Sequence, residues 1–224
     1  RQDDFTPGGV NNRRPDRASI AYANHIRSAF RPCAPIILGG VEASLRRIAH
    51  YDFWSDGVRR PLLFDAKADA LVYGMAERTV LQLAAALRDG ADWRGLRGLC
   101  HAAPEPPADA LVLPSFAALT DPAEPEAAKR AFLRMFRLFA ANQDPVTARP
   151  LAQQVDGRWL VHNPPAAPLE TAELDRVHAL PFTRDVHPRD AARGEVRALD
   201  TVRFSLAAHR GCYGECAFCA IAMH

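Results

Sequence analysis

Three cysteines close to one another in the sequence, Cys212, Cys216 and Cys219, have a spacing suited to metal binding. Three thiolates on one short loop can hold three irons of a cubane [4Fe–4S] cluster, whereas an electron-transfer cluster normally takes four cysteines. The fourth iron then has no protein ligand and can bind a substrate. The spacing therefore predicts a [4Fe–4S] cluster that takes part in chemistry, with these three cysteines as its ligands.

A structural zinc site is the alternative for these cysteines. Zinc takes four Cys or His ligands, and His209 or His224 could supply the fourth. Gly211 and Gly214 could bend the loop around a cluster and offer N–H groups to its sulfides, although loop flexibility explains Gly214 equally well. We expect His209 and Arg210, which precede the first cysteine, to form supporting hydrogen bonds rather than to contact a cofactor.

The residues just before the cysteines alternate between apolar and polar types. Residues 202–206 have this alternation, which predicts a strand that leads into the cysteine loop. In barrel enzymes, the loops at the carboxyl ends of strands form the active site. A cluster loop directly after a strand is therefore in a favourable place.

Two apolar runs in the first half of the chain end at glycines. Residues 34–38 lead into Gly39 and Gly40, while residues 68–73 lead into Gly74. The second run is followed by residues 77–87, whose apolar side chains have helical spacing. A strand, a glycine turn and a helix form half of a βαβ unit. The pattern predicts an α/β fold with a partial doubly wound, parallel sheet, in which ligands lie outside the carboxyl ends of the strands.

The central part of the sequence combines a connection, a helix and a hairpin. Residues 102–125 are rich in proline and alanine, and we expect a connection there. Residues 125–140 predict an amphipathic helix whose stripe packs in a core. The stripe consists of four residues: Phe132, Met135, Phe136 and Phe139. Residues 151–161 predict a β-hairpin around Asp156-Gly157. A short helix is expected at 173–180, followed by an extended linker.

Composition and cysteine usage favour a cytoplasmic globular protein. The chain has 224 residues, of which 48% are hydrophobic, and begins with Arg1, so both of its ends look cut from a longer protein. No apolar run approaches the roughly 18 residues that a membrane span needs, and the start has no secretory pattern. An odd cysteine count argues against a secreted disulfide framework. We expect Cys33 and Cys100 to be small buried hydrophobic residues.

Charge gives little indication of a nucleic-acid partner. The net charge is +2, and arginines are scattered, with pairs at 13–14, 46–47 and 59–60 that we interpret as surface groups or ion-pair partners. Residues 50–54 combine a histidine, an acid and three aromatics, which suits either a pocket wall or packing between domains. Asp52 and Asp56 do not form a convincing acid–base pair. No catalytic residue is predicted.

Several stretches of the chain resemble the YgiQ family of radical SAM proteins, also called UPF0313. The cysteine spacing itself, with an aromatic residue before the last cysteine, resembles the radical SAM signature. The other matching stretches are residues 35–56, 58–60, 67–69, 71–77, 163–165 and 209–212. The resemblance covers most of the chain.

The resemblance implies a division into three parts and a radical mechanism. Residues 1–110 would be an incomplete N-terminal α/β domain of cobalamin-binding type, residues 111–197 a linker region with a helix and a hairpin, and residues 198–224 the start of a radical SAM barrel. The full-length protein would bind the cluster and S-adenosylmethionine and generate a 5′-deoxyadenosyl radical on an unknown substrate. Because most of the barrel is missing, this fragment alone should be inactive.

Cobalamin is not an expected cofactor. The Asp-x-His-x-x-Gly sequence that usually carries the cobalt-ligating histidine does not occur. Flavodoxin or ferredoxin is an expected reductant, whereas a membrane partner is not. A non-catalytic module that uses zinc or an iron–sulfur cluster for structure or electron transfer is the alternative function.

Overall fold

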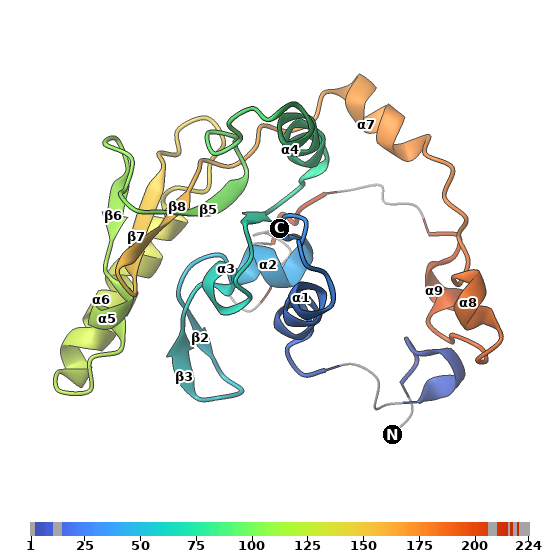
Figure 1. The fold of residues 1–224 in the computed structure, drawn as a ribbon, viewed down its shortest axis with the longest axis horizontal. Helices are drawn as coiled ribbons and strands as arrows, with labels where there is room; N and C mark the ends of the chain where they lie inside the picture. Colours follow the sequence, from blue (N-terminus) through green and yellow to red (C-terminus); the bar gives the residue numbers. More distant parts are fainter. Residues whose placement is uncertain (1–2, 11–14, 206–209, 215, 217–218, 220–224) are drawn as a thin grey trace.

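A mixed six-stranded sheet forms the centre of the molecule (Figure 1). The computed structural model describes residues 3–10, 15–205, 210–214, 216 and 219. Its elements, in chain order, are η1 (Pro7–Gly9), α1 (Ala18–Ala29), β1 (Ile37–Leu38), α2 (Gly40–Leu45), β2 (His50–Asp52), β3 (Gly57–Arg59), α3 (Leu62–Asp65), β4 (Ala70–Val72), α4 (Glu77–Asp89), β5 (Leu99–Ala103), β6 (Leu111–Leu113), α5 (Phe116–Leu119), α6 (Pro125–Ala140), β7 (Leu151–Val155), β8 (Arg158–His162), α7 (Thr171–His178), α8 (Pro188–Ala191) and α9 (Leu199–Val202).

The sheet is mixed rather than parallel throughout. Its strand order is β1-β4-β5-β8-β7-β6, with parallel pairs at β1–β4 and β6–β7 and antiparallel pairs elsewhere. A tight turn joins β7 to β8 through Asp156 and Gly157, which have φ angles of 48° and 79°. Such a turn forces neighbouring strands to run antiparallel. The predicted hairpin and the α/β class are confirmed, and the two strands that end at glycines, β1 and β4, run parallel as expected, whereas the sheet as a whole is mixed.

The predicted strand–turn–helix unit is present around β4. The chain leaves β4, turns at Gly74 with a φ of 67° and enters α4. Gly90 ends α4 in the left-handed conformation, with a φ of 65°, which glycine adopts without the steric cost that a Cβ would bring. Because β1 runs parallel to β4, the turn at Gly39-Gly40 lies at the same edge of the sheet as Gly74.

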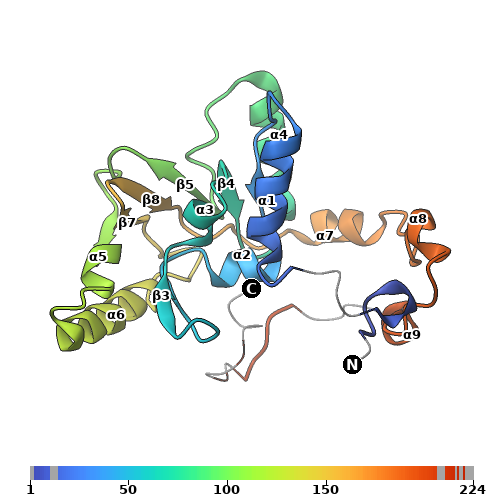
Figure 2. The same ribbon diagram turned by 60° about the horizontal axis from the view of Figure 1, so that its bottom comes forward.

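Both faces of the sheet are covered by helices. Side chains alternate along β4, so that Leu71 belongs to the larger core while Val72 belongs to a smaller one. The smaller core includes Leu83 of α4, and the larger core includes Met135 and Phe139 of α6. Helices on opposite faces therefore bury each residue of this strand (Figures 1 and 2).

Helix α6 has the predicted length, but its apolar stripe is only partly buried. Met135 and Phe139 are buried, and Phe132 is partly buried and packs against the core. Phe136, in contrast, is 52% exposed. The prediction that all four stripe residues pack in the core is therefore wrong for Phe136, which lines a surface groove with Tyr51.

The sheet continues across residue 110, where the sequence predicts a domain boundary. The expected connection at 102–125 contains the end of β5, all of β6 and α5. Strand β6 pairs with β7, and β5 pairs with β8. Strands β5 and β6 are short and lie near prolines. They join the sheet because the β7–β8 hairpin, later in the chain, supplies their hydrogen-bonding partners.

The predicted strand at 202–206 is wrong for its first residues. Leu199–Val202 form α9, and the Arg203 N–H donates to the Leu199 carbonyl at 2.8 Å. Residues 206–209 lie outside the described part of the chain. No strand in the described part of the chain pairs with this segment, so its backbone groups are satisfied by local bonds instead.

The segment before α9 returns to the beginning of the chain (Figure 2). The Gly8 N–H donates to the Glu195 carbonyl at 3.0 Å, and the Ala198 N–H donates to the Asp4 carbonyl at 3.0 Å. Gly194 has a φ of 117°, and a Cβ there would lie 2.9 Å from the Gly8 Cα. The two backbones therefore approach closely because this position has no side chain.

Candidate functional site

The described part of the cysteine loop brings two of the three predicted ligands near Gly214. The Gly214 N–H donates to the Cys212 sulfur at 3.4 Å. A Cβ on Gly214 would lie 3.4 Å from the Cys216 sulfur and 3.6 Å from the Cys212 sulfur. Both sulfurs therefore lie close to a position that has no side chain, and a backbone amide donates to one of them, the kind of hydrogen bond that tunes the potential of an iron–sulfur cluster.

The third cysteine is not gathered with the other two. The Cys219 N–H donates to the Cys216 carbonyl at 2.9 Å, so the backbone turns between them. Cys212 and Cys216 are exposed, and Cys219 is partly buried. No three His, Cys, Asp or Glu side chains among the described residues are close enough together to hold a metal ion. The alternative zinc ligands His209 and His224 lie outside the described residues.

An ion pair fixes the beginning of the cysteine loop. Arg210 lies 2.7 Å from a carboxylate oxygen of Glu77, in the first turn of α4. Helix α4 starts just after Gly74, so the pair holds the loop at the carboxyl end of β4. Arg210 thus makes a supporting contact, as expected, and its partner is Glu77 of α4. The loop lies at the sheet edge where α/β proteins bind ligands.

A pocket of about 510 Å³ lies beside this loop. Arg210 and Gly211 form one side of it, and Tyr73 and Gly74, at the end of β4, form another. A wall of small and apolar residues at 165–169, just after β8, faces them. This volume falls within the range of ordinary small-molecule sites, about 300–1,000 Å³.

Two arginines hold the wall of the pocket by its backbone. Arg97 donates to the carbonyls of Pro165, at 2.9 Å, and Pro145. Arg78 donates to the Pro168 carbonyl at 3.2 Å and also pairs with Glu173 of α7. This irregular segment thus gains from side chains the hydrogen bonds that it does not obtain from the sheet.

Arg47 forms the base of the pocket. It is only 2% exposed, and its Nε donates to Nε2 of His162 at 3.0 Å. Its two amino groups donate to the Ser44 carbonyl and to the Gln143 side-chain oxygen. The guanidinium also lies between the rings of Tyr73 and Phe139, 4.5 and 4.6 Å from their centroids.

The buried groups around Arg47 are neutral. Burial, together with the Arg47 charge, lowers the pKa of His162 to about 3. Burial also raises the pKa of Tyr73 well above its usual value, and its hydroxyl donates to the Asn163 carbonyl at 2.6 Å. Cys100 is fully buried, which raises its pKa to about 12, so the prediction that it is a buried apolar residue is confirmed. Cys33 is only partly buried.

Residues 50–54 do not line this pocket. Phe53 and Trp54 are 78% and 72% exposed at the tip of the β2–β3 hairpin. Asp52 is buried, accepts from Ser55 and pairs with Arg17 at 2.6 Å, so its pKa falls to about 2. A carboxylate that stays ionised in this way serves as the partner of Arg17 and Ser55.

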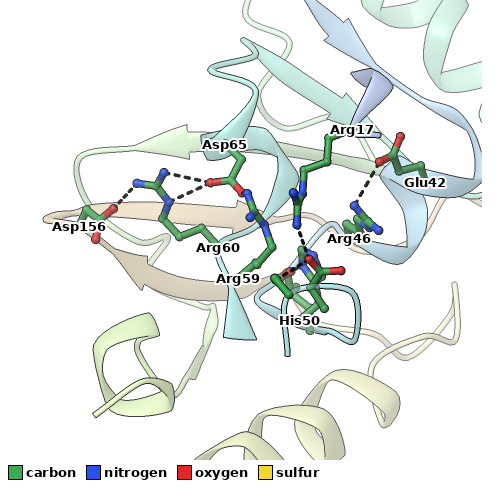
Figure 3. A network of polar contacts seen from close by, with 11 residues as sticks. Arg17, Glu42, Arg46, His50, Arg59, Arg60, Asp65 and Asp156 are labelled. Carbon is green, nitrogen blue, oxygen red and sulfur yellow. Dashed lines mark hydrogen bonds and ion pairs between the residues drawn. The ribbon is translucent and has the colours of Figure 1, made fainter. Parts of the chain in front are cut away.

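Three of the four described arginines in these sequence pairs, Arg46, Arg59 and Arg60, form ion pairs (Figure 3). Arg59 and Arg60 both contact Asp65, and Arg60 also reaches Asp156 at 2.7 Å. Arg46 pairs with Glu42. These contacts confirm the interpretation of arginine pairs 46–47 and 59–60 as internal partners except at Arg47; the pair at 13–14 lies outside the described residues.

Sequence reasoning missed the residues of the pocket. Arg47, Tyr73 and Gln143 come from three distant segments, and only contacts between segments bring them together. Gly74, by contrast, was predicted to turn at the ligand-binding edge of the sheet.

Comparisons with known proteins identify similar sequences. A family model described as Radical SAM N-terminal matches residues 1–205. The UPF0313 protein FN0734 of Fusobacterium nucleatum is 50% identical over all of this chain, UPF0313 protein GSU2873 of Geobacter sulfurreducens is 47% identical, and a UPF0313 protein of Thermotoga maritima is 46% identical over 99% of the chain. The chain spans 37–38% of the length of these relatives. No solved structure matches.

Proposed function

Because this chain belongs to the UPF0313 family and carries its Radical SAM N-terminal domain, we propose that the full-length protein is a radical SAM enzyme. Cys212, Cys216 and Cys219 would hold its [4Fe–4S] cluster, with one iron left free for S-adenosylmethionine. With one electron from a reductant, the loaded protein would cleave S-adenosylmethionine to methionine and a 5′-deoxyadenosyl radical that takes a hydrogen atom from a substrate. We place this chemistry in the cytoplasm, with a reductant such as flavodoxin or ferredoxin as the electron donor.

The spacing of the three cysteines in a chain of this family carries the proposal. Two observations support it: the Gly214 N–H donates to the Cys212 sulfur, and the Cys216 sulfur lies near the same glycine. Exposure of Cys212 and Cys216 leaves both sulfurs accessible to iron. The donor set is all thiolate, which suits an iron–sulfur cluster.

The residues around the loop have positioning roles. The pair between Arg210 and Glu77 holds the loop beside the pocket, so a substrate in the pocket would lie near the cysteines. Pro165 and Leu169 form apolar parts of the pocket lining. The 224-residue chain alone is too short to contain the barrel as well as the domain described here, so we expect activity only from the full-length protein.

Anaerobic reconstitution of the full-length protein tests the assignment. We expect equal amounts of iron and sulfide, the visible absorbance of a [4Fe–4S] cluster, and an electron paramagnetic resonance signal that changes when S-adenosylmethionine is added. Cys212→Ser, Cys216→Ser and Cys219→Ser should each reduce bound iron to background, because three ligands are the minimum that the site offers. Cys33→Ser is the matched control and should retain the cluster.

A structural metal module is the second candidate, since three thiolates and a histidine also suit zinc. Four-coordinate zinc in the purified protein, with no response to S-adenosylmethionine after iron reconstitution, would reject the enzyme assignment and support this module.

A further inference from the structure

The pocket beside the cysteine loop contains a buried positive charge that no acid balances. The three described hydrogen-bond acceptors of Arg47 are a neutral histidine, a backbone carbonyl and a neutral amide. None of the ion pairs found in the described part of the chain involves Arg47. No aspartate or glutamate is among the described residues that line the pocket.

Such a charge is costly unless a partner compensates it. An unpaired ion is strongly destabilising in a protein interior, and the faces of Tyr73 and Phe139 offset only part of this through cation–π contacts. Burial accordingly lowers the pKa of Arg47, although a guanidinium remains protonated in proteins. An anion in the pocket would supply the missing counter-charge.

Arg47 also has donor capacity left for a ligand. A guanidinium carries five N–H groups, and the three hydrogen bonds described above engage one each. His162 and Gln143 hold the group in position, so its fork is oriented before a ligand arrives. An oriented guanidinium suits the planar geometry of a carboxylate or the oxygens of a phosphate.

The rest of the pocket indicates the shape of the ligand. Its lining is largely apolar and includes Pro165, Pro168, Leu169 and Pro145. The second cation at the pocket, Arg210, is already neutralised by Glu77. The pocket therefore combines one uncompensated charge with an apolar surface, as small-molecule sites commonly do.

We propose that this pocket binds a small molecule with one carboxylate or phosphate group, which contacts Arg47, and an apolar body, which packs against the proline-rich wall. The pocket is lined by residues from several segments between 47 and 211, and binding there does not depend on a cluster at the cysteine loop.

Titration of the full-length protein without a reconstituted cluster tests the site. The probes are benzoate and phenyl phosphate, with benzyl alcohol as a neutral analogue of similar size, at constant ionic strength. We expect saturable binding of an anionic probe by calorimetry and a matching rise in melting temperature. The tighter of the two anions identifies the charged group of the ligand.

Three variants connect the binding to the pocket. Arg47→Met should weaken binding by about tenfold or more, the loss of a charged hydrogen bond. Ala167→Trp should abolish it, because the new ring fills the pocket from an exposed position outside the core. Arg88→Met is the matched control, since Arg88 is exposed and pairs only with the adjacent Asp89 among described residues; binding should be unchanged.

Several outcomes would overturn the proposal. They are the absence of saturable binding by both anions, equal binding of benzyl alcohol, and unchanged binding in Ala167→Trp. If Arg47→Met fails to fold, Ala167→Trp decides the question. Because these measurements use protein without a cluster, their failure is distinct from failure of the proposed radical chemistry.

Discussion

At the scale of single residues, Asp52 shows how a buried carboxylate supports the β2–β3 hairpin. It accepts from the Ser55 hydroxyl at 2.7 Å and pairs with Arg17 at 2.6 Å. These contacts lower its pKa to about 2 from an ordinary value of 3.8. The hairpin and the region before α1 are thus connected by one ionised group.

Asp52→Asn should reduce stability at neutral pH, because the amide loses the ion pair with Arg17. A lowered folded-state pKa stabilises the fold above pH 4, and this stabilisation is lost as the pH falls from about 4 to 2. Urea midpoints should therefore differ at pH 7 and converge near pH 2. Asp56→Asn is the control: Asp56 is exposed, its φ of 48° suits asparagine, and its midpoint should hardly change.

Gly214→Ala should lower iron occupancy in the reconstituted full-length protein, if the cysteine loop holds a cluster. The added Cβ would lie 3.4 Å from the Cys216 sulfur, in space that a cluster sulfide or iron would otherwise approach. Iron analysis measures the effect. Gly95→Ala, where a Cβ meets nothing within 4 Å, should leave iron unchanged; equal occupancy in both variants would contradict this role for Gly214.

The sequence indicated part of the candidate site, but it did not indicate that Arg47 is buried there. The cysteine spacing and the turn at Gly74 were evident in the sequence, because both depend on local order. Arg46 and Arg47 look equivalent there, yet Arg46 pairs with Glu42 near the surface while Arg47 is buried. The direction that each side chain takes depends on packing against Phe139 and His162, which are distant in sequence.

At the scale of elements, α6 covers one face of the sheet with part of its apolar stripe. Met135→Ala should destabilise the protein by about 2–5 kcal/mol, because a fully buried side chain leaves a cavity. Leu133→Ala, at a position 49% exposed on the same helix, should cost about 0.5 kcal/mol or less. Chemical denaturation measures both. Similar losses would show that the stripe is not packed as described.

The sequence correctly predicted those helices and strands whose periodicity and end signals both lie within the segment itself. Helices α4 and α6 and the β7–β8 hairpin have periodicity together with end or turn signals, and all are present. Helix α1 was missed, since only Ala23 among its residues is buried and it lacks a capping side chain. The strand expected at 202–206 is not formed by its described residues, 202–205, because alternation alone does not supply a partner strand.

At the scale of the whole molecule, Gln153 connects segments from across the chain. Its side-chain oxygen accepts from the Ala49 N–H, and its amide donates to the Pro114 carbonyl, both at 3.0 Å. Gln153→Leu should cost about 1–3 kcal/mol for each buried group left unpaired, as judged by urea unfolding. Gln154→Leu, on the exposed face of β7, is the control and should change stability little.

The continuous sheet predicts that residues 1–110 do not fold alone. In that fragment β5 would lose its pairing with β8, and Cys100, which pairs with His162, would lie at an open edge. Circular dichroism and proteolysis of the isolated fragment should show an unfolded or aggregating chain, whereas residues 1–170 should resist protease. A stable fragment 1–110 would instead support the boundary expected from sequence.

Strand order could not be derived from the sequence, for a physical reason. The sequence specifies which residues can be strands, but β5 pairs on one side with β4 and on the other with the distant β8 rather than with β6, the next strand in the chain. Such long-range choices depend on the whole core and leave no local signal.

Arg78 and Arg97 donate hydrogen bonds to main-chain carbonyls of the pocket wall, and this affects how the wall can evolve. Because the wall at 165–169 is positioned through its backbone, substitutions there can change the lining without moving the segment. Selection could therefore alter which molecules this domain admits while the scaffold stays constant. Among members of the UPF0313 family we expect Arg78 and Arg97 to be retained, and we expect the side chains at positions 165–169 to vary.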